Sequence, residues 1–233
     1  MHTIDHDVTD PTDLEIPDET LAEWQSLVDT MAELAGIPAG LIMRLTDDDI
    51  EVFLSSDTAG NPYEPGDREH FEDSGLYCET VIRSNEALLV PDALADPDWE
   101  DNPDVKLGMI SYLGYPILLP NQTPFGTICI LDDEANEYSG PVRALIPKFR
   151  DLIEYHLELL YMNQVLGEQN RRFSDHLEEI HALRGLIPIC AWCKKIKDDE
   201  GYWNAVEKYL ARFPDTRFSH AICPDCAASR IDV

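Results

Sequence analysis

The sequence predicts an α+β protein with an antiparallel sheet, helices on one side of it, a long helix and a small cysteine-bearing module. Three observations support this prediction. Short apolar and β-branched runs separated by turn residues fill residues 39–132 and follow a helix-like segment. Apolar residues then recur at intervals of three and four over 141–184, which is the period of a helix. Two C-x-x-C pairs follow within 185–233.

The N-terminal part predicts a flexible lead and one helix. Residues 1–18 are acidic and contain prolines, so we expect a loosely attached segment. A helix is predicted from Asp18 or Thr20, either of which can serve as its N-cap, to about Ala35. Its apolar positions at helical spacing are Leu21, Trp24, Leu27, Val28, Met31 and Leu34. Gly36 then ends the helix.

The next segment carries the strand patterns. Strands are predicted at 39–45, 50–55, 87–91, 109–118 and 125–132, and a short helix at 78–84. Turns at 46–49 and 120–123 join the first two and the last two strands into hairpins. Loops are expected at 56–66 and at 92–104, the second being rich in Asp and Pro.

The long helix, 141–184, carries a heptad pattern. Its d positions are Leu145, Leu152, Leu159, Leu166, Phe173 and Ile180. Its a positions are Phe149, His156, Asn163, Asn170 and Leu177. Polar a residues favour a defined register and a parallel pair, so we expect a coiled-coil linker that forms a homodimer. The alternative is a helix that covers the preceding domain with its apolar face.

Several sequence blocks carry a family resemblance. They are YCETVI (77–82), LVPDA (89–93), DPDW (96–99), NP (102–103), SYLGYPI (111–117) and FGTICILD (125–132). In this order they resemble the GAF domains of bacterial signalling proteins, over about residues 20–140. The resemblance implies a six-stranded antiparallel sheet with flanking helices, and either a small-molecule pocket or a dimer-forming role. The expected domains are thus the lead, a GAF-like sensor domain at 19–140, the linker at 141–184 and the module at 185–233.

Five residues are candidates for contact with an unidentified small-molecule ligand. Tyr77, Cys78, Trp99, Tyr112 and Tyr115 lie in or beside the long loop and its facing strand. Aromatic walls with a few polar groups suit a ligand pocket. The alternative for each residue is packing in the core.

The C-terminal module predicts a structural zinc site. Cys190, Cys193, Cys223 and Cys226 form two C-x-x-C pairs, which supply the four thiolates of a closed tetrahedral Zn²⁺ site. The spacer exceeds the common ~15–20 residues and leaves room for a helix over 202–213. Alternatives are four free thiols or a redox pair, and His220 is a reserve ligand. The blocks LRGLIPIC (183–190), DDEGYW (198–203) and ICPDC (222–226) are similar to a tail found behind GAF, PAS and receiver domains.

Composition restricts the class of protein. The formal net charge of −29 over 233 residues argues against nucleic acid as a partner, because phosphates are repelled. No apolar run is long enough for a membrane helix, and the first residues lack the pattern of a signal peptide, so a cytoplasmic location is expected.

These observations favour a signal-transduction protein, not an enzyme. A GAF-like domain would sense a small molecule or a redox state and signal through a dimeric coiled coil. The zinc module would then dock a protein partner. The alternative is a thiol-redox enzyme that uses the C-x-x-C pairs, or a GAF-type reductase.

Overall fold

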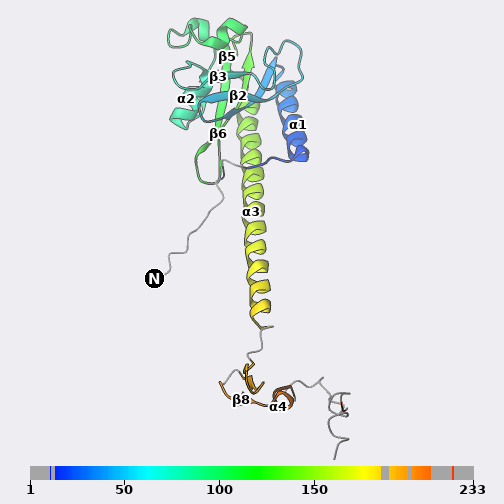
Figure 1. The fold of residues 1–233 in the computed structure, drawn as a ribbon. Coiled ribbons are helices and arrows are strands. Elements are labelled where there is room, and N and C mark those ends of the chain that lie inside the picture. Colours follow the sequence, from blue (N-terminus) through cyan, green and yellow to red (C-terminus); the bar gives the residue numbers. More distant parts are fainter. Residues whose placement is uncertain (1–10, 12–13, 185–188, 199–200, 211–221, 223–233) are drawn as a thin grey trace, which may run out of the picture. The chain divides into compact units, whose positions relative to one another are not determined.

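The computed structural model describes residues 11, 14–184, 189–198, 201–210 and 222. The chain divides into two units, Met1–Gln169 and Asn170–Val233. The first contains a six-stranded sheet in the order β3-β2-β1-β6-β5-β4, with every neighbouring pair antiparallel (Figure 1). The strands are β1 (Ala39–Leu45), β2 (Asp49–Ser55), β3 (Arg68–His70), β4 (Leu88–Val90), β5 (Ser111–Leu118) and β6 (Pro124–Asp132). The predicted α+β fold with a six-stranded antiparallel sheet is confirmed.

Strand β3 is the one that the residue patterns do not predict. Its three residues are all polar and exposed, and it lies at the edge of the sheet beside β2. A short exposed edge strand shows no alternation of apolar and polar residues, so the usual signal for a strand is missing.

Helices cover both faces of the sheet, and the expectation of helices on one side is wrong. Helix α2 (Tyr77–Ser84) lies on one face, while α1 (Asp18–Ala35) and α3 (Gly140–Arg184) contribute to the core on the other. The central strands explain this arrangement. Leu41 of β1 belongs to the core under α2, and the next residue, Ile42, to the core under α1 and α3. Since successive side chains point to opposite faces, a strand that is apolar throughout requires cover on both.

Helix α1 begins without the predicted side-chain cap. Its N-cap is Pro17, not Asp18 or Thr20, and no side chain caps the first turn. At the other end Gly36 has φ 69°, a left-handed conformation that glycine adopts readily, and its N–H donates to the carbonyl of Ala32 at 2.9 Å. Just before the helix, Leu14 and Ile16 pack against the core, so this part of the expected flexible lead is attached.

Helix α3 begins as predicted but uses its first turns to cover the sheet. The residues that pack in the core are Val142, Ile146, Phe149, Ile153 and Leu157. His156 also faces the domain, where its Nδ1 accepts a hydrogen bond from Trp24 Nε1 at 3.0 Å. Phe149 and His156 therefore cannot line a seam between two helices, and their assignment to a positions is wrong. The alternative of a domain-covering helix describes α3 up to Leu157.

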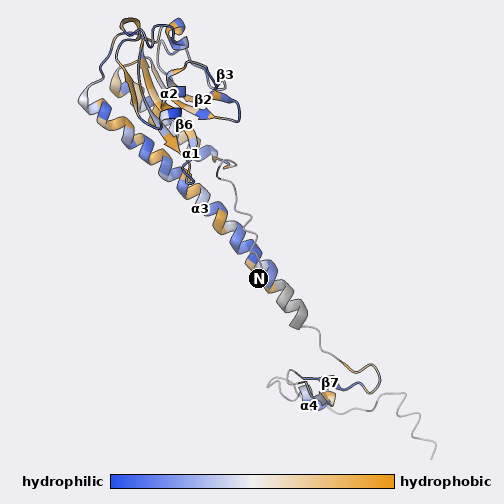
Figure 2. Cartoon of the chain, turned by 90° about the vertical axis from the view of Figure 1, so that its left-hand side faces the viewer, coloured by the Kyte–Doolittle hydropathy of each residue, from blue (hydrophilic) through white to orange (hydrophobic). Residues whose placement is uncertain are grey.

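A different set of apolar residues on α3 is exposed to solvent. They are Leu152, Tyr155, Leu159, Met162, Leu166, Phe173 and Leu177. Hydrophobic residues recur along the helix between hydrophilic ones (Figure 2). No described side chain between 158 and 177 is buried. The side chains of Ile180 and Arg184, placed in the heptad pattern, lie outside those described.

The second unit contains a short hairpin and a short helix. Strands β7 (Ile196–Lys197) and β8 (Trp203–Asn204) pair antiparallel, and α4 spans Val206–Leu210. The turn is organised by Asp198, whose carboxylate accepts from the Tyr202 N–H at 2.7 Å and from Asn204 Nδ2 at 2.6 Å. The predicted helix over 202–213 is therefore wrong at its start, because Trp203 and Asn204 pair in a hairpin. Residues 211–213 lie outside the described part.

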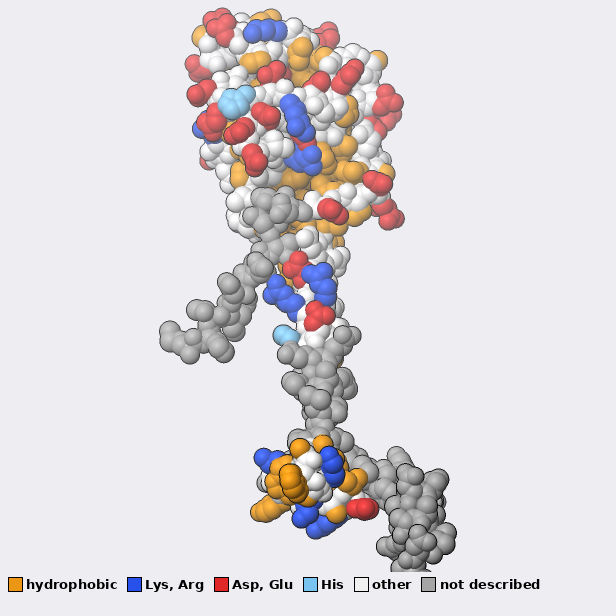
Figure 3. Space-filling model, in the orientation of Figure 1, with side chains coloured by type: hydrophobic (Ala, Val, Ile, Leu, Met, Phe, Trp, Pro, Cys, Tyr) orange, Lys and Arg blue, Asp and Glu red, His pale blue; other side chains and the backbone are white. Residues whose placement is uncertain are grey.

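The surface of the first unit carries many acidic side chains, spread over the face shown in Figure 3 and not gathered in one place. Among the described residues, no helix has both the length and the apolar character that a membrane crossing requires.

Candidate functional site

Four of the five predicted ligand residues lie together under α2. Tyr77 and Cys78 form the first turn of that helix, Tyr112 lies on β5, and Trp99 comes from the loop after β4. The ring of Tyr77 stacks on Tyr112 with centroids 4.7 Å apart and contacts Trp99 at 5.2 Å. We call Tyr77, Cys78, Trp99 and Tyr112 the aromatic–thiol cluster. Because Tyr77 and Tyr112 are fully buried, the cluster is closed by its own packing.

Tyr115 is not part of this cluster, which corrects the predicted set. It lies on the opposite face of β5, packs with the core under α3, and donates a hydrogen bond to the Arg143 carbonyl at 3.3 Å. Residues three apart on a strand face opposite sides of the sheet. The sequence alone was therefore enough to place Tyr112 and Tyr115 on opposite faces of the sheet.

A glycine gives Tyr112 its position. A Cβ atom at Gly114 would overlap the hydroxyl oxygen of Tyr112, so the ring can lie along β5 only because residue 114 has no side chain. The hydroxyl then comes within 3.5 Å of Cys78 Sγ.

The sulfur of Cys78 has several polar neighbours. Thr127 on β6 donates a hydrogen bond to it at 3.3 Å, in addition to the contact with Tyr112. Cys129, two residues beyond Thr127, is fully buried and belongs to the same core cluster. The Cys129 thiol, with Thr127 and Tyr112, lowers the pKa of Cys78 despite its burial. Burial, together with Cys78, raises the pKa of Cys129.

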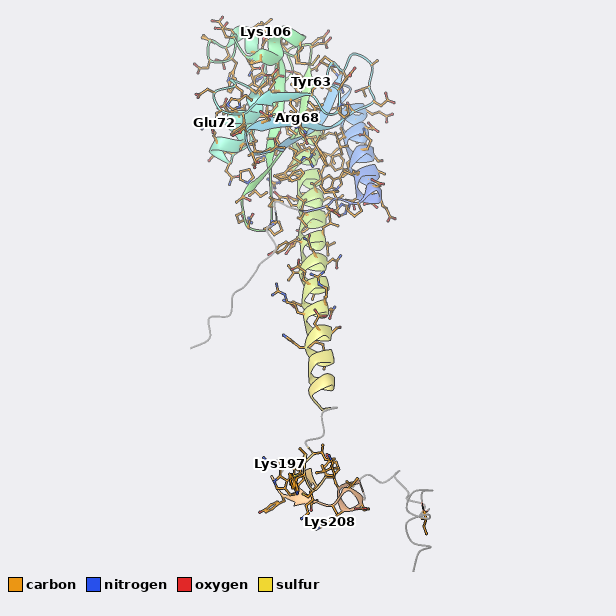
Figure 4. All side chains as sticks on the ribbon, viewed as in Figure 1. Tyr63, Arg68, Glu72, Lys106, Lys197 and Lys208 are labelled. Atoms are coloured by element: carbon orange, nitrogen blue, oxygen red, sulfur yellow. The ribbon has the colours of Figure 1, made fainter. Side chains whose placement is uncertain are left out.

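A buried carboxyl, which sequence reasoning missed, lies beside the aromatic rings. Asp104 accepts a hydrogen bond from the hydroxyl of Tyr63 at 2.7 Å, and Figure 4 shows where Tyr63 lies. Burial, opposed by that hydrogen bond, raises the pKa of Asp104 from 3.8 to about 6. Within the described residues, the hydroxyl of Tyr77 is the only buried side-chain oxygen or nitrogen without a hydrogen-bond partner. The local signal in the sequence was Asn102, whose side-chain oxygen accepts a hydrogen bond from the Asp104 N–H and so fixes the turn that carries this carboxyl.

Hollows in the surface of the first unit lie away from these residues. One of about 260 Å³ is lined by Leu118, Pro120, Asp151, Glu154 and Glu158, among others, between the β5–β6 turn and α3. Another, of about 400 Å³, is lined by residues that include Glu33, Gly36, Thr58 and Asp133. Neither contains a residue predicted to bind the ligand.

The first C-x-x-C pair forms a tight turn. The Cys193 N–H donates to Cys190 Sγ at 3.5 Å, the Cys190 N–H donates to the Lys195 carbonyl at 2.8 Å, and Lys194 has φ 60°. Backbone N–H groups of Cys193 and Trp192 lower the pKa of Cys190. Cysteine binds zinc as the thiolate, and backbone donors beside the sulfur stabilise that form, so the turn at Cys190 is compatible with a zinc ligand.

The second half of the predicted zinc site, Cys223 and Cys226, lies outside the described residues, as does His220. Among the residues that are described, no group of three or more His, Cys, Asp or Glu side chains is arranged to hold a metal ion. The four-thiolate site therefore stays a prediction.

Comparisons with known proteins identify the fold of the first unit. The blue-light absorbing form of the PixJ GAF domain from Thermosynechococcus elongatus has a TM-score of 0.51 at 16% identity, covering 70% of this chain and 99% of its own. A methyl-accepting chemotaxis protein, residues 122 to 287, has a TM-score of 0.50 at 15% identity, covering 62% and 90%. A type II free methionine-R-sulfoxide reductase from Thermoplasma acidophilum has a TM-score of 0.47 at 15% identity, covering 60% and 92%. A comparison with curated proteins finds no match.

The model of the GAF domain family matches residues 20–160, a span that contains the whole sheet, α2 and the part of α3 that packs on the core. The chain therefore belongs to the GAF domain family, whose fold senses small molecules or light in signalling proteins.

Proposed function

We propose that this protein is a cytoplasmic signal-transduction protein, not an enzyme, in which the GAF domain senses a small molecule or a redox state. The signal passes through α3, paired with the same helix of a second copy, to a zinc-stabilised C-terminal module that docks a protein partner. The observation that carries the proposal is that α3 has two apolar faces. One packs on the sensing domain, and the other is exposed.

The two faces of α3 lie on roughly opposite sides of the helix. At 100° per residue, the packed residues and the exposed ones are centred roughly 140° apart. Leu159, Leu166 and Phe173 are 57%, 51% and 63% exposed. An apolar stripe of this length ordinarily requires a partner surface, and an identical stripe on a second copy is suited to it.

The exposed stripe also changes the expected register of the pair. The predicted d residues Leu152, Leu159 and Leu166 are retained, but they alternate with Tyr155 and Met162 instead of His156 and Asn163. The intervals of three and four persist, so this seam still satisfies a heptad repeat. The aromatic–thiol cluster packs on one face of the sheet, and α3 packs on the other. A change at the cluster can therefore reach α3 through the sheet, and α3 carries the seam on its exposed face.

Replacing Leu159 and Leu166 together with Asp is expected to convert the dimer into a monomer. Two carboxylates on the seam would be placed opposite their own copies in a parallel pair, where like charges repel. Light scattering coupled to size-exclusion chromatography measures the result, and the expected mass falls to half. A wild-type protein that remains monomeric at high concentration would contradict the proposed pairing.

Neighbouring positions provide the matched control for the register. Met162→Asp is expected to weaken the dimer at least tenfold, whereas Asn163→Asp, with the same new side chain one residue away, is expected to leave it nearly unchanged. The reverse ranking would support the original heptad through Asn163 and refute the seam on the exposed stripe.

The purified protein is expected to contain one tightly bound zinc ion per chain. The turn at Cys190 directs the backbone N–H of Cys193 at its sulfur, and a small module with few apolar residues needs a metal to stabilise it. Elemental analysis measures the metal, and Cys190→Ser should remove most of it. A metal-free protein with four freely reacting tail thiols would instead support the alternative of a thiol-redox enzyme.

A further inference from the structure

Cys78 differs from an ordinary buried cysteine in its surroundings. Its sulfur accepts a hydrogen bond from Thr127 at 3.3 Å and lies 3.5 Å from the hydroxyl of Tyr112. Thr127 and Tyr112 are fully buried, and Cys78 is buried with 7% of the residue exposed. A cysteine in apolar surroundings is normally held as an inert neutral thiol. Here two hydroxyl groups contact the sulfur from two strands of the sheet, and the one of Thr127 donates a hydrogen bond to it.

Cys129 lies beside this group. Thr127 and Cys129 are two residues apart on β6, so their side chains point to the same face, toward α2. Both cysteines belong to one core cluster, and each alters the ionisation of the other. Of the two sulfurs, Cys78 is the one that accepts a hydrogen bond from Thr127 and lies beside Tyr112. These contacts favour its thiolate, and the Cys129 thiol together with them lowers its pKa, whereas burial raises the pKa of Cys129.

We propose that Cys78 and Cys129 form a peroxide-reactive pair in the core of the GAF domain, with Cys78 as the attacking sulfur and Cys129 as the resolving one. The proposal deepens the proposed function by naming its input, and it rests on the GAF domain being the sensing part. It requires neither the zinc site nor the helix pair.

The chemistry balances with hydrogen peroxide as the oxidant. The Cys78 thiolate attacks one peroxide oxygen and breaks the O–O bond. The departing hydroxide takes up a proton and leaves as water, and Cys78 becomes a sulfenic acid. The sulfur of Cys129 then attacks Cys78, the S–O bond breaks, and the hydroxyl leaves as a second water with the Cys129 proton. Two thiols are oxidised to one disulfide, and one peroxide is reduced to two waters.

The disulfide would change the contacts under α2. A new bond from Cys78 to β6 would turn the thiol that Thr127 and Tyr112 now contact into a disulfide sulfur, which has no proton to donate and no negative charge. The contacts of two buried hydroxyls with this sulfur would be weakened, which is unfavourable. Since Tyr112 also stacks on Tyr77 in the first turn of α2, the start of this helix has to adjust. Burial of both sulfurs restricts the reaction to small oxidants.

The test treats the reduced full-length protein with hydrogen peroxide, blocks remaining thiols, and maps disulfides by peptide mass spectrometry. The expected product is a link between the peptides that contain Cys78 and Cys129. In Cys129→Ser the reaction should stop at a sulfenic acid on Cys78, which a dione reagent traps. In Cys78→Ser, Cys129 should stay reduced. Absence of the link, or a Cys78 that stays reduced while exposed thiols oxidise, would overturn the proposal.

Two matched variants separate this mechanism from a general effect on the core. Thr127→Val keeps the side-chain shape but removes the donor, and oxidation of Cys78 should slow by about tenfold. Ser111→Ala removes another buried hydroxyl, which contacts Tyr138 at 3.1 Å, and should leave the rate unchanged. Equal slowing in both would refute the role of Thr127. Measuring the mass of the protein in the same samples tests the pairing of α3 independently of the oxidation of Cys78.

Discussion

Replacing Gly126 with alanine is expected to lower the free energy of unfolding of the GAF domain by about 3 kcal/mol or more. Gly126 lies on β6 opposite Arg44 of β1, and a Cβ atom there would overlap the carbonyl of Met43. That carbonyl is backbone in the centre of the sheet, so it cannot turn aside as a side chain could. The two central strands would have to separate locally.

Thermal unfolding followed by circular dichroism measures this effect, and the expected drop in Tm is roughly 10 °C. Gly167→Ala is the matched control, because nothing lies within 4 Å of the added methyl group. Gly167 lies inside α3, where alanine is favoured over glycine by about 1 kcal/mol, so the control should be neutral or stabilising. Similar losses in both variants would contradict the close approach of β1 and β6.

Replacing Asp104 with asparagine is expected to stabilise the domain at neutral pH by up to about 3 kcal/mol. The pKa of Asp104 is raised from 3.8 to about 6, mainly because the carboxyl is buried. The folded state therefore binds a proton that the unfolded state has already lost between these values. In the wild type this group's contribution is fully present below pH 3.8 and is lost as the pH rises through about 6.

The gain from Asp104→Asn should thus be largest above pH 6 and fade between pH 6 and 4, because the wild-type carboxyl becomes neutral over that range. The hydrogen bond from Tyr63 is kept in the variant, because the amide oxygen can still accept it. Urea unfolding across this range measures it. Asp101→Asn serves as the control, since it removes one negative charge from the same loop at an exposed position. A gain that is equal in both variants, or independent of pH, would show that net charge and not burial is responsible.

Parts of the candidate site follow from local rules, and others do not. The placement of Cys78 in the first turn of a short helix follows from the pattern around 78–84. The opposite faces of Tyr112 and Tyr115 follow from the period of a strand. The meeting of Tyr63 with Asp104 joins residues 41 positions apart in the sequence. No local pattern specifies such a contact, because it depends on how the loops close over the sheet.

The sequence by itself determined the α+β class, the order of the strands and helices apart from the edge strand β3, and the extent of the long helix, and its residue blocks carried the resemblance to GAF domains. The helices and strands follow from periodicity and turn residues, which act over a few neighbouring positions, whereas the GAF fold followed from the resemblance. The tertiary structure decided which side of each element is buried. Helix α3 has apolar residues in more than one direction, and only the contacts of Trp24 with His156 and of the sheet with Ile153 show which direction the domain uses. The same holds for the sulfur of Cys78, because the hydroxyls of Tyr112 and Thr127 that contact it are distant in sequence and come close only after folding.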